Sequence, residues 1–127
     1  MTREDKELLL KDLCGRLPYG VKVTNGIYTI TLTPCSDTSI IIKNGHILPY
    51  LRPMSSMTEE EYESVSWEGC SHAYNYSSIS GFRFIEIKTF TLNILNWLNA
   101  NHFDYRNLIP RGLALKASED MYREEQQ

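Results

Sequence analysis

Two Asn-Gly dipeptides, Asn25-Gly26 and Asn44-Gly45, each lie between runs of residues that favour β-strands. Asn-Gly is the strongest short signal for a β-hairpin, because both residues tolerate the positive φ that a tight turn needs. The sequence therefore predicts two hairpins, over residues 21–32 and 39–51. Because Pro49 has no amide hydrogen to donate, we expect the second return strand to be short or to lie at a sheet edge.

A helix is predicted before the first hairpin. Thr2 can cap it, and Asp5 stands three residues later, as in a capping box with a shorter acidic side chain. Leucines then recur at helical spacing, and Gly15 is a typical residue for a helix C-terminus. We expect this helix to cover residues 3–14.

Four different sequence patterns follow one another in the second half of the chain. Thr58 opens a second capping box and predicts a short helix over 59–65. Residues 66–80 are rich in Ser, Tyr, Asn and Gly, which indicates a long ordered loop. Alternation over 82–88 predicts a strand, and helical spacing predicts a helix over 90–101 whose asparagines form its polar face.

The order of helix, two hairpins, helix, strand and helix indicates an α+β fold, since strict βαβ alternation is missing. We expect a small antiparallel sheet or partly open barrel of about five strands, flanked by an N-terminal and a C-terminal helix. The chain has 127 residues, of which 42% are hydrophobic. One globular domain is therefore predicted over 1–115, followed by a charged, partly disordered tail over 116–127.

Localisation follows from what the sequence contains and lacks. No apolar run approaches the length of a transmembrane helix, and the polar N-terminus does not resemble a secretory signal. The three cysteines, Cys14, Cys35 and Cys70, are widely spaced, which favours reduced thiols over disulfides. We expect a cytoplasmic protein that does not enter membranes, with Cys14 buried on the first helix.

Catalytic and metal-binding patterns are weak. Cys70 with His72 offers a conceivable nucleophile and base, and His102 a further ligand, yet the spacing matches no strong zinc or catalytic pattern. Ordinary structural roles are favoured, with His102 as a cation at a helix end. We therefore expect no cofactor and no metal, and an enzyme is the less favoured class.

Aromatic and arginine side chains crowd the second half of the chain, and such residues dominate binding hot spots. They predict a non-catalytic protein that binds a macromolecule, most of all another protein. The candidate binding residues are Trp67, Tyr74, Tyr76, Tyr105, Arg106 and Arg111.

Two alternative functions belong to other classes of protein. One is a nucleic-acid-binding module built on the small barrel, with Lys22, Lys43, Arg52 and Arg83 as phosphate contacts. A net charge of −3 does not favour it, because phosphate-binding domains usually carry a basic excess. The other is an enzyme that depends on Cys70 and His72.

Three stretches, 1–21, 51–61 and 97–106 continued by 112–115, carry a resemblance. They resemble a group of small proteins without assigned activity that phages and prophages of gut Bacteroidetes encode. The resemblance implies a bacterial or phage cytosolic setting, so we expect the binding protein predicted above to be an accessory protein of a phage or mobile element. It implies no catalytic residue.

Overall fold

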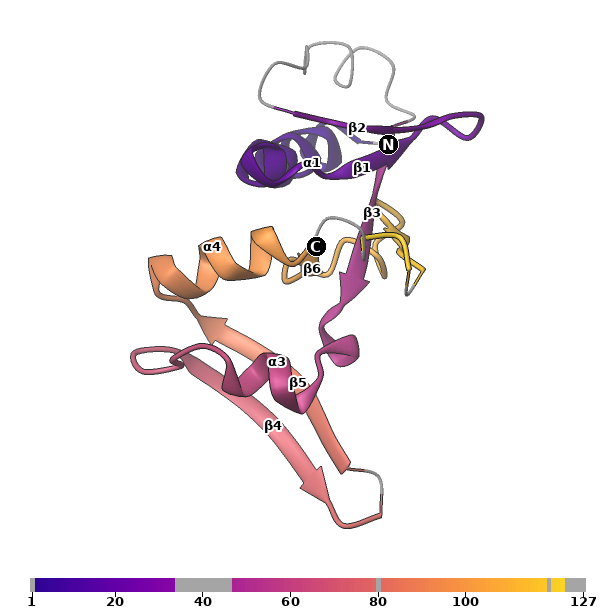
Figure 1. Ribbon diagram of the computed structural model, residues 1–127. Helices are drawn as coiled ribbons and strands as arrows, with labels where there is room; N and C mark the ends of the chain where they lie inside the picture. The colour runs from indigo at the N-terminus through magenta and orange to yellow at the C-terminus, as the bar shows by residue number, and fades with distance from the viewer. Residues whose placement is uncertain (1, 34–46, 80, 119, 123–127) are drawn as a thin grey trace.

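The computed structural model describes residues 2–33, 47–79, 81–118 and 120–122 (Figure 1). Its elements are α1 (Arg3–Arg16), η1 (Leu17–Tyr19), β1 (Lys22–Thr24), β2 (Thr29–Thr31), β3 (Leu48–Pro53), η2 (Met54–Ser56), α3 (Glu59–Glu63), β4 (Ser71–Ser77), β5 (Gly81–Thr89), α4 (Leu92–Ala100), β6 (Phe103–Asp104) and β7 (Leu115–Lys116). The predicted α+β class is confirmed, with a helix near each end and no closed barrel among the described residues. None of the helices described is both long and apolar enough to cross a membrane.

The strands form two separate sheets. The larger has the order β2-β1-β3-β6, and β7 also pairs with β3. The pairs β1–β2 and β1–β3 are antiparallel as expected, whereas β6 and β7 run parallel to β3, so this sheet is mixed. The smaller sheet is the antiparallel pair β4–β5, which we call the ribbon.

The hairpin predicted over 21–32 is confirmed as β1 and β2, in antiparallel register. Its turn is longer than the two residues expected, because the last strand pair is Thr24 with Thr29. Asn25 shapes this turn by accepting two backbone amides at its Oδ1 atom, each at 2.9 Å. Residues 39–46 of the second predicted hairpin lie outside the described residues.

The prediction that the strand containing Pro49 is short or lies at an edge is wrong. β3 is six residues long and lies in the middle of its sheet. Its neighbours change along its length: β1 lies opposite Leu48 and Pro49, β7 opposite Tyr50 and Leu51, and β6 opposite Arg52 and Pro53. A proline is tolerated here because no single partner pairs along the whole strand.

α1 continues to Arg16, two residues beyond the prediction, so Gly15 lies within the helix and does not end it. A β-carbon on Gly15 would lie 3.4 Å from Nδ2 of Asn99 on α4. The glycine therefore allows α1 to approach α4 closely. Asn99 is buried, although it was expected on a polar face, and Cys14 is exposed, contrary to its predicted burial.

The long loop predicted over 66–80 is wrong in its second half, because residues 71–77 form β4. Tyr74 pairs with Phe84 and Tyr76 with Phe82 across the ribbon. Such aromatic cross-strand pairs stabilise a sheet even where the flanking residues are weak β-formers. The other predictions in this half are confirmed as α3, β5 and α4, and both capping-box hydrogen bonds of α3 are present.

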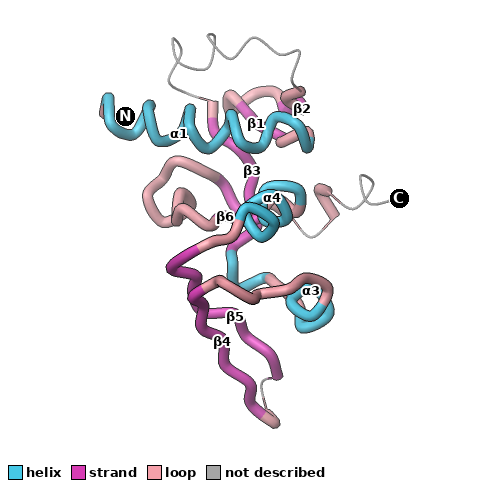
Figure 2. The backbone as a smooth tube through the Cα atoms, turned by 90° about the vertical axis from the view of Figure 1, so that its left-hand side faces the viewer, coloured by secondary structure: helices cyan, strands magenta, loops and turns pink. Residues whose placement is uncertain are grey.

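The interior contains two hydrophobic clusters. The first lies between α1 and the larger sheet and comprises Leu9, Leu13, Val21, Val23, Leu32, Leu51, Leu108, Leu113 and Ala114. The second comprises Met57, Phe84, Ile94, Leu98 and Phe103, with Tyr62 and both tryptophans packed against it. Figures 1 and 2 show the result: α1 with β1 and β2 at one end, α4 and β6 in the middle, and α3 with the ribbon at the other end.

The C-terminal segment is part of the packed fold beyond residue 115, where the tail was expected to begin. The amide of Ala117 donates to the carbonyl of Leu51 at 2.8 Å. Tyr122 is buried, its hydroxyl donates to the carbonyl of Tyr50 at 2.6 Å, and its ring stacks on His102 with centroids 3.5 Å apart. A buried aromatic therefore anchors residues 116–118 and 120–122, which lie within the range of the predicted tail, to the rest of the fold.

Candidate binding site

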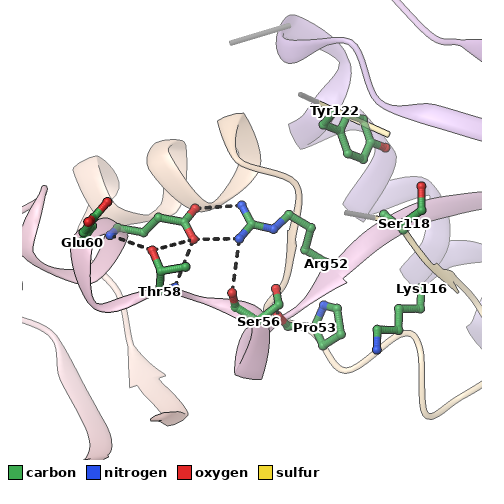
Figure 3. Close-up of a pocket in the computed structure, with 10 residues that line it drawn as sticks. Arg52, Pro53, Ser56, Thr58, Glu60, Lys116, Ser118 and Tyr122 are labelled. Carbon is green, nitrogen blue, oxygen red and sulfur yellow. Dashed lines mark hydrogen bonds and ion pairs between the residues drawn. The ribbon is translucent and has the colours of Figure 1, made fainter. Parts of the chain in front are cut away.

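One hollow has a volume of about 1000 Å³ and lies between the end of β3, the start of α3 and β7 (Figure 3). Arg52 reaches along it and donates to both carboxylate oxygens of Glu61, at 2.7 and 2.8 Å. Burial raises the pKa of Glu61, but the hydrogen bonds from Arg52 and from the Thr58 amide outweigh it, so the pKa lies below 4.5.

These charged groups already satisfy one another. The guanidinium of Arg52 also lies over the ring of Phe103, 4.2 Å from its centroid. A bidentate arginine–carboxylate pair that is stacked on an aromatic ring is held in one geometry. This hollow therefore has a braced charged pair along one side, which fixes η2 and α3 relative to β3.

A second hollow has a volume of about 300 Å³ and lies between α3 and one face of the ribbon. Figure 2 shows α3 beside the strands of the ribbon. We call this hollow the aromatic groove. Its lining consists of four aromatic and two acidic side chains: Glu59, Tyr62, Glu63, Tyr74, Tyr76 and Phe82.

Tyr62 stands at the centre of this groove. Its ring centroid lies 5.1 Å from that of Tyr74, 5.0 Å from Phe82 and 5.0 Å from Trp67, on which it stacks. Its hydroxyl hydrogen-bonds Nε2 of His72 at 2.7 Å. Burial, with a smaller contribution from Tyr74, raises the pKa of Tyr62, so this phenol is neutral at physiological pH.

Trp67 supports the groove from behind. Its indole N–H donates to the carbonyl of Tyr62 at 2.7 Å, and its ring lies 5.3 Å from Phe84 and 6.0 Å from Trp97. Contacts at these separations are favourable aromatic pairs. The rings beneath the groove therefore have fixed positions before any ligand arrives.

The outer wall is open to solvent. The exposed fraction is 51% for Tyr74 and 62% for Tyr76, and Ile79 at the ribbon tip is 96% exposed. Tyr74, Tyr76, Phe82 and Phe84 share one face of the ribbon, because they are cross-strand partners at every second position. Two solvent-exposed tyrosines therefore stand in a row on one face of the ribbon.

The six predicted binding residues separate into three groups. Tyr74 and Tyr76 lie in the groove, and Trp67 lies beneath it. Tyr105 and Arg106 lie in a different cluster: the Tyr105 hydroxyl donates to Asn99 at 2.8 Å and Arg106 donates to the buried Asp12 at 2.8 Å. Arg111 is exposed on the loop between β6 and β7, outside the groove lining.

The residues that sequence reasoning missed are Glu59, Tyr62, Glu63 and Phe82. The spacing of Glu59, Tyr62 and Glu63 places all three on one face of α3. This spacing is visible in the sequence, but it indicates a groove only once residues 71–77 are known to form the strand β4 that faces α3.

The Cys70–His72 pair has other partners. The thiol of Cys70 accepts the amide of Thr91 at 3.4 Å, and Nδ1 of His72 contacts the carbonyl of Cys70 at 3.3 Å. Both ring nitrogens of His72 are thus engaged, since Nε2 bonds Tyr62. Within the described part of the chain no three acidic, His or Cys side chains cluster as metal ligands.

The interpretation of His102 as a cation at a helix end is wrong. His102 is 3% exposed, and burial together with the positive charges of Arg16, Arg52 and Lys22 lowers its pKa to about 3. The imidazole is therefore neutral at physiological pH, and it contributes by stacking on Tyr122.

The candidate phosphate contacts are partly occupied by the fold. Nζ of Lys22 donates to the carbonyl of Met121 at 2.6 Å, and Arg52 is paired with Glu61. Arg83 is exposed on β5, and Lys43 lies outside the described residues. Two of the four side chains therefore make internal contacts.

No protein family, no curated protein and no solved structure matches this chain. The aromatic groove and the ribbon are therefore the basis for a functional conclusion.

Proposed function

We propose that the chain is a non-catalytic binding protein whose partner is another protein, held on the ribbon face. By ribbon face we mean the aromatic groove together with Ile79 at the ribbon tip. One observation carries this proposal: two tyrosines that are more than half exposed stand in a row on a strand face, beside an isoleucine that is 96% exposed.

The residue types favour a protein partner. Tyrosine is enriched in hot spots because it offers a large amphipathic surface and loses little conformational entropy on binding. Large apolar side chains gathered at one exposed place are typical of an interaction site. The prearranged rings under the groove lower the cost of ordering on binding.

The ribbon also offers backbone groups. Among the described residues no third strand pairs with β4 or β5, so each strand has one open edge. An open edge can accept an extended segment of another protein as an additional strand. The face and the edge together suit a partner that binds in an extended conformation.

A non-catalytic role is supported by the engagement of His72 through both ring nitrogens, which leaves it poorly placed to act as a base for Cys70. The setting that we propose, a phage or other mobile element of gut Bacteroidetes, rests on the resemblance of the three sequence stretches alone.

The test compares two double variants in capture experiments from a Bacteroidetes lysate. Tyr74→Ser with Tyr76→Ser removes the exposed aromatics of the ribbon face. Ile27→Ser with Tyr28→Ser is the matched control, since Ile27 and Tyr28 are 79% and 68% exposed on the distant β1–β2 hairpin.

A partner that binds the wild type and the control, and is lost with the ribbon variant, is the expected result. Circular dichroism verifies that both variants fold. A partner retained by the ribbon variant and lost by the control would contradict the proposal.

A further inference from the structure

We infer that the aromatic groove binds a cationic side chain, an arginine or lysine that a basic segment of the protein partner presents. This inference rests on the proposed function and deepens it, because it specifies the chemistry of the partner. It follows from two independent properties of the groove, its aromatic walls and its unpaired carboxylates.

The walls of the groove are aromatic. Tyr62 is inclined at 46° to Tyr74 and at 38° to Phe82, with all three rings within 6 Å of one another. The π systems of three rings therefore border the groove. A guanidinium or ammonium group is attracted to the face of an aromatic ring, and it stays partly hydrated at an open site.

The carboxylates of Glu59 and Glu63 add negative charge at the same place. They stand four residues apart on α3, so they lie on one side of the helix and repel each other. Among the described residues neither has an ion-pair partner, whereas Glu61 of the same helix is paired with Arg52. A cation from outside would relieve this repulsion.

The volume suits a single long side chain. About 300 Å³ is at the lower end of the range for ligand pockets, so the groove holds one arginine or lysine and no large cofactor. The combination of π faces and two carboxylates distinguishes a cation from an apolar side chain of similar size. Charge complementarity therefore selects a basic segment as the occupant.

The experiment titrates the full chain with a short Gly/Ser peptide that carries one central arginine, followed by backbone amide NMR. The matched peptide has citrulline, which keeps the shape of arginine and removes its charge. We expect shifts confined to residues 59–63, 72–77 and 82–84 with the arginine peptide and none with the citrulline peptide, and weakening at high salt.

Two double variants of the protein test whether the carboxylates of the groove attract the peptide. Glu59→Gln with Glu63→Gln weakens binding about fivefold, because each exposed carboxylate contributes a modest attraction. Glu4→Gln with Glu7→Gln lowers the net negative charge equally on α1, far from the groove, and leaves binding unchanged.

Equal binding of the citrulline peptide, or an equal effect of the two Gln double variants, would overturn the inference. So would shifts that lie outside α3 and the ribbon. If the arginine peptide fails while the Tyr74→Ser, Tyr76→Ser variant still loses a captured protein, this inference is refuted and the proposed function stands. If the ribbon variant also keeps its partner, both are refuted.

Discussion

Individual residues hold α1 against the middle of the molecule through a buried charged network. Asp12 accepts from Arg16 at 2.7 and 3.1 Å and from Arg106 at 2.8 Å. Arg16 also donates to the carbonyl of Phe103 at 2.6 Å, and the side chains of Asp12 and Arg16 are fully buried. Buried charges persist only where they are paired in this way. Arg106, predicted to bind a partner, thus serves the fold.

Asp12→Asn should lower the free energy of unfolding by about 3–5 kcal/mol, because it leaves Arg16 buried without a compensating charge. Denaturant unfolding measures the loss. Arg3→Gln is the control, since it breaks only the exposed pair with Glu7 and should change stability by less than about 1 kcal/mol. Similar losses for both variants would contradict the role of the network.

His102 makes stability depend on pH. Its pKa is about 3 in the folded chain and 6.5 in its ordinary state, so the unfolded chain binds more protons between these values. Stability is therefore complete above pH 6.5 and decreases as the pH falls toward 3.

Between pH 7 and pH 5 we expect a loss of about 2 kcal/mol in the free energy of unfolding, measured by urea denaturation. Glu61, whose pKa is also lowered, likewise makes the fold less stable as the pH falls, but its contribution is lost only below about pH 4.5. Asparagine suits the positive φ of 64° at position 102. His102→Asn should therefore remove most of the pH dependence of the free energy of unfolding above pH 5. A wild-type chain equally stable at both pH values would disprove this account.

At the scale of elements, the capping boxes, the first Asn-Gly hairpin and the amphipathic C-terminal helix could be predicted, because each signal lies within a few neighbouring residues. The strand β4 could not, since its Tyr, Ser and Asn residues become a strand only through pairing with Phe82 and Phe84. The central position of Pro49 likewise depends on β6 and β7, which follow much later in the chain.

Tyr122 shows the same dependence on distant contacts. Tyr122→Ala should cost about 3 kcal/mol or more, because it removes a buried ring stacked on His102 and a hydroxyl that bonds Tyr50 and the amide of Lys22. Thermal unfolding measures this cost. Stability equal to the wild type would indicate that the C-terminal segment is not anchored as described.

At the scale of the whole molecule, the two ends have different surfaces. The β1–β2 hairpin exposes Ile27 and Tyr28, whereas the ribbon combines exposed tyrosines with the groove against α3. Two tyrosines of the predicted binding set belong to this surface. The other four are Trp67, Tyr105 and Arg106, which make contacts within the fold, and Arg111, which is exposed elsewhere, because sequence alone does not reveal which side chains the fold engages.

The most direct test of the ribbon face is photo-cross-linking of the full chain in a Bacteroidetes lysate. A benzophenone amino acid replaces Tyr76 in one protein and Tyr28 in the other, both at exposed tyrosine positions. We predict a discrete covalent adduct from position 76 that is absent from position 28. An adduct formed from position 28 and not from position 76 would contradict the account.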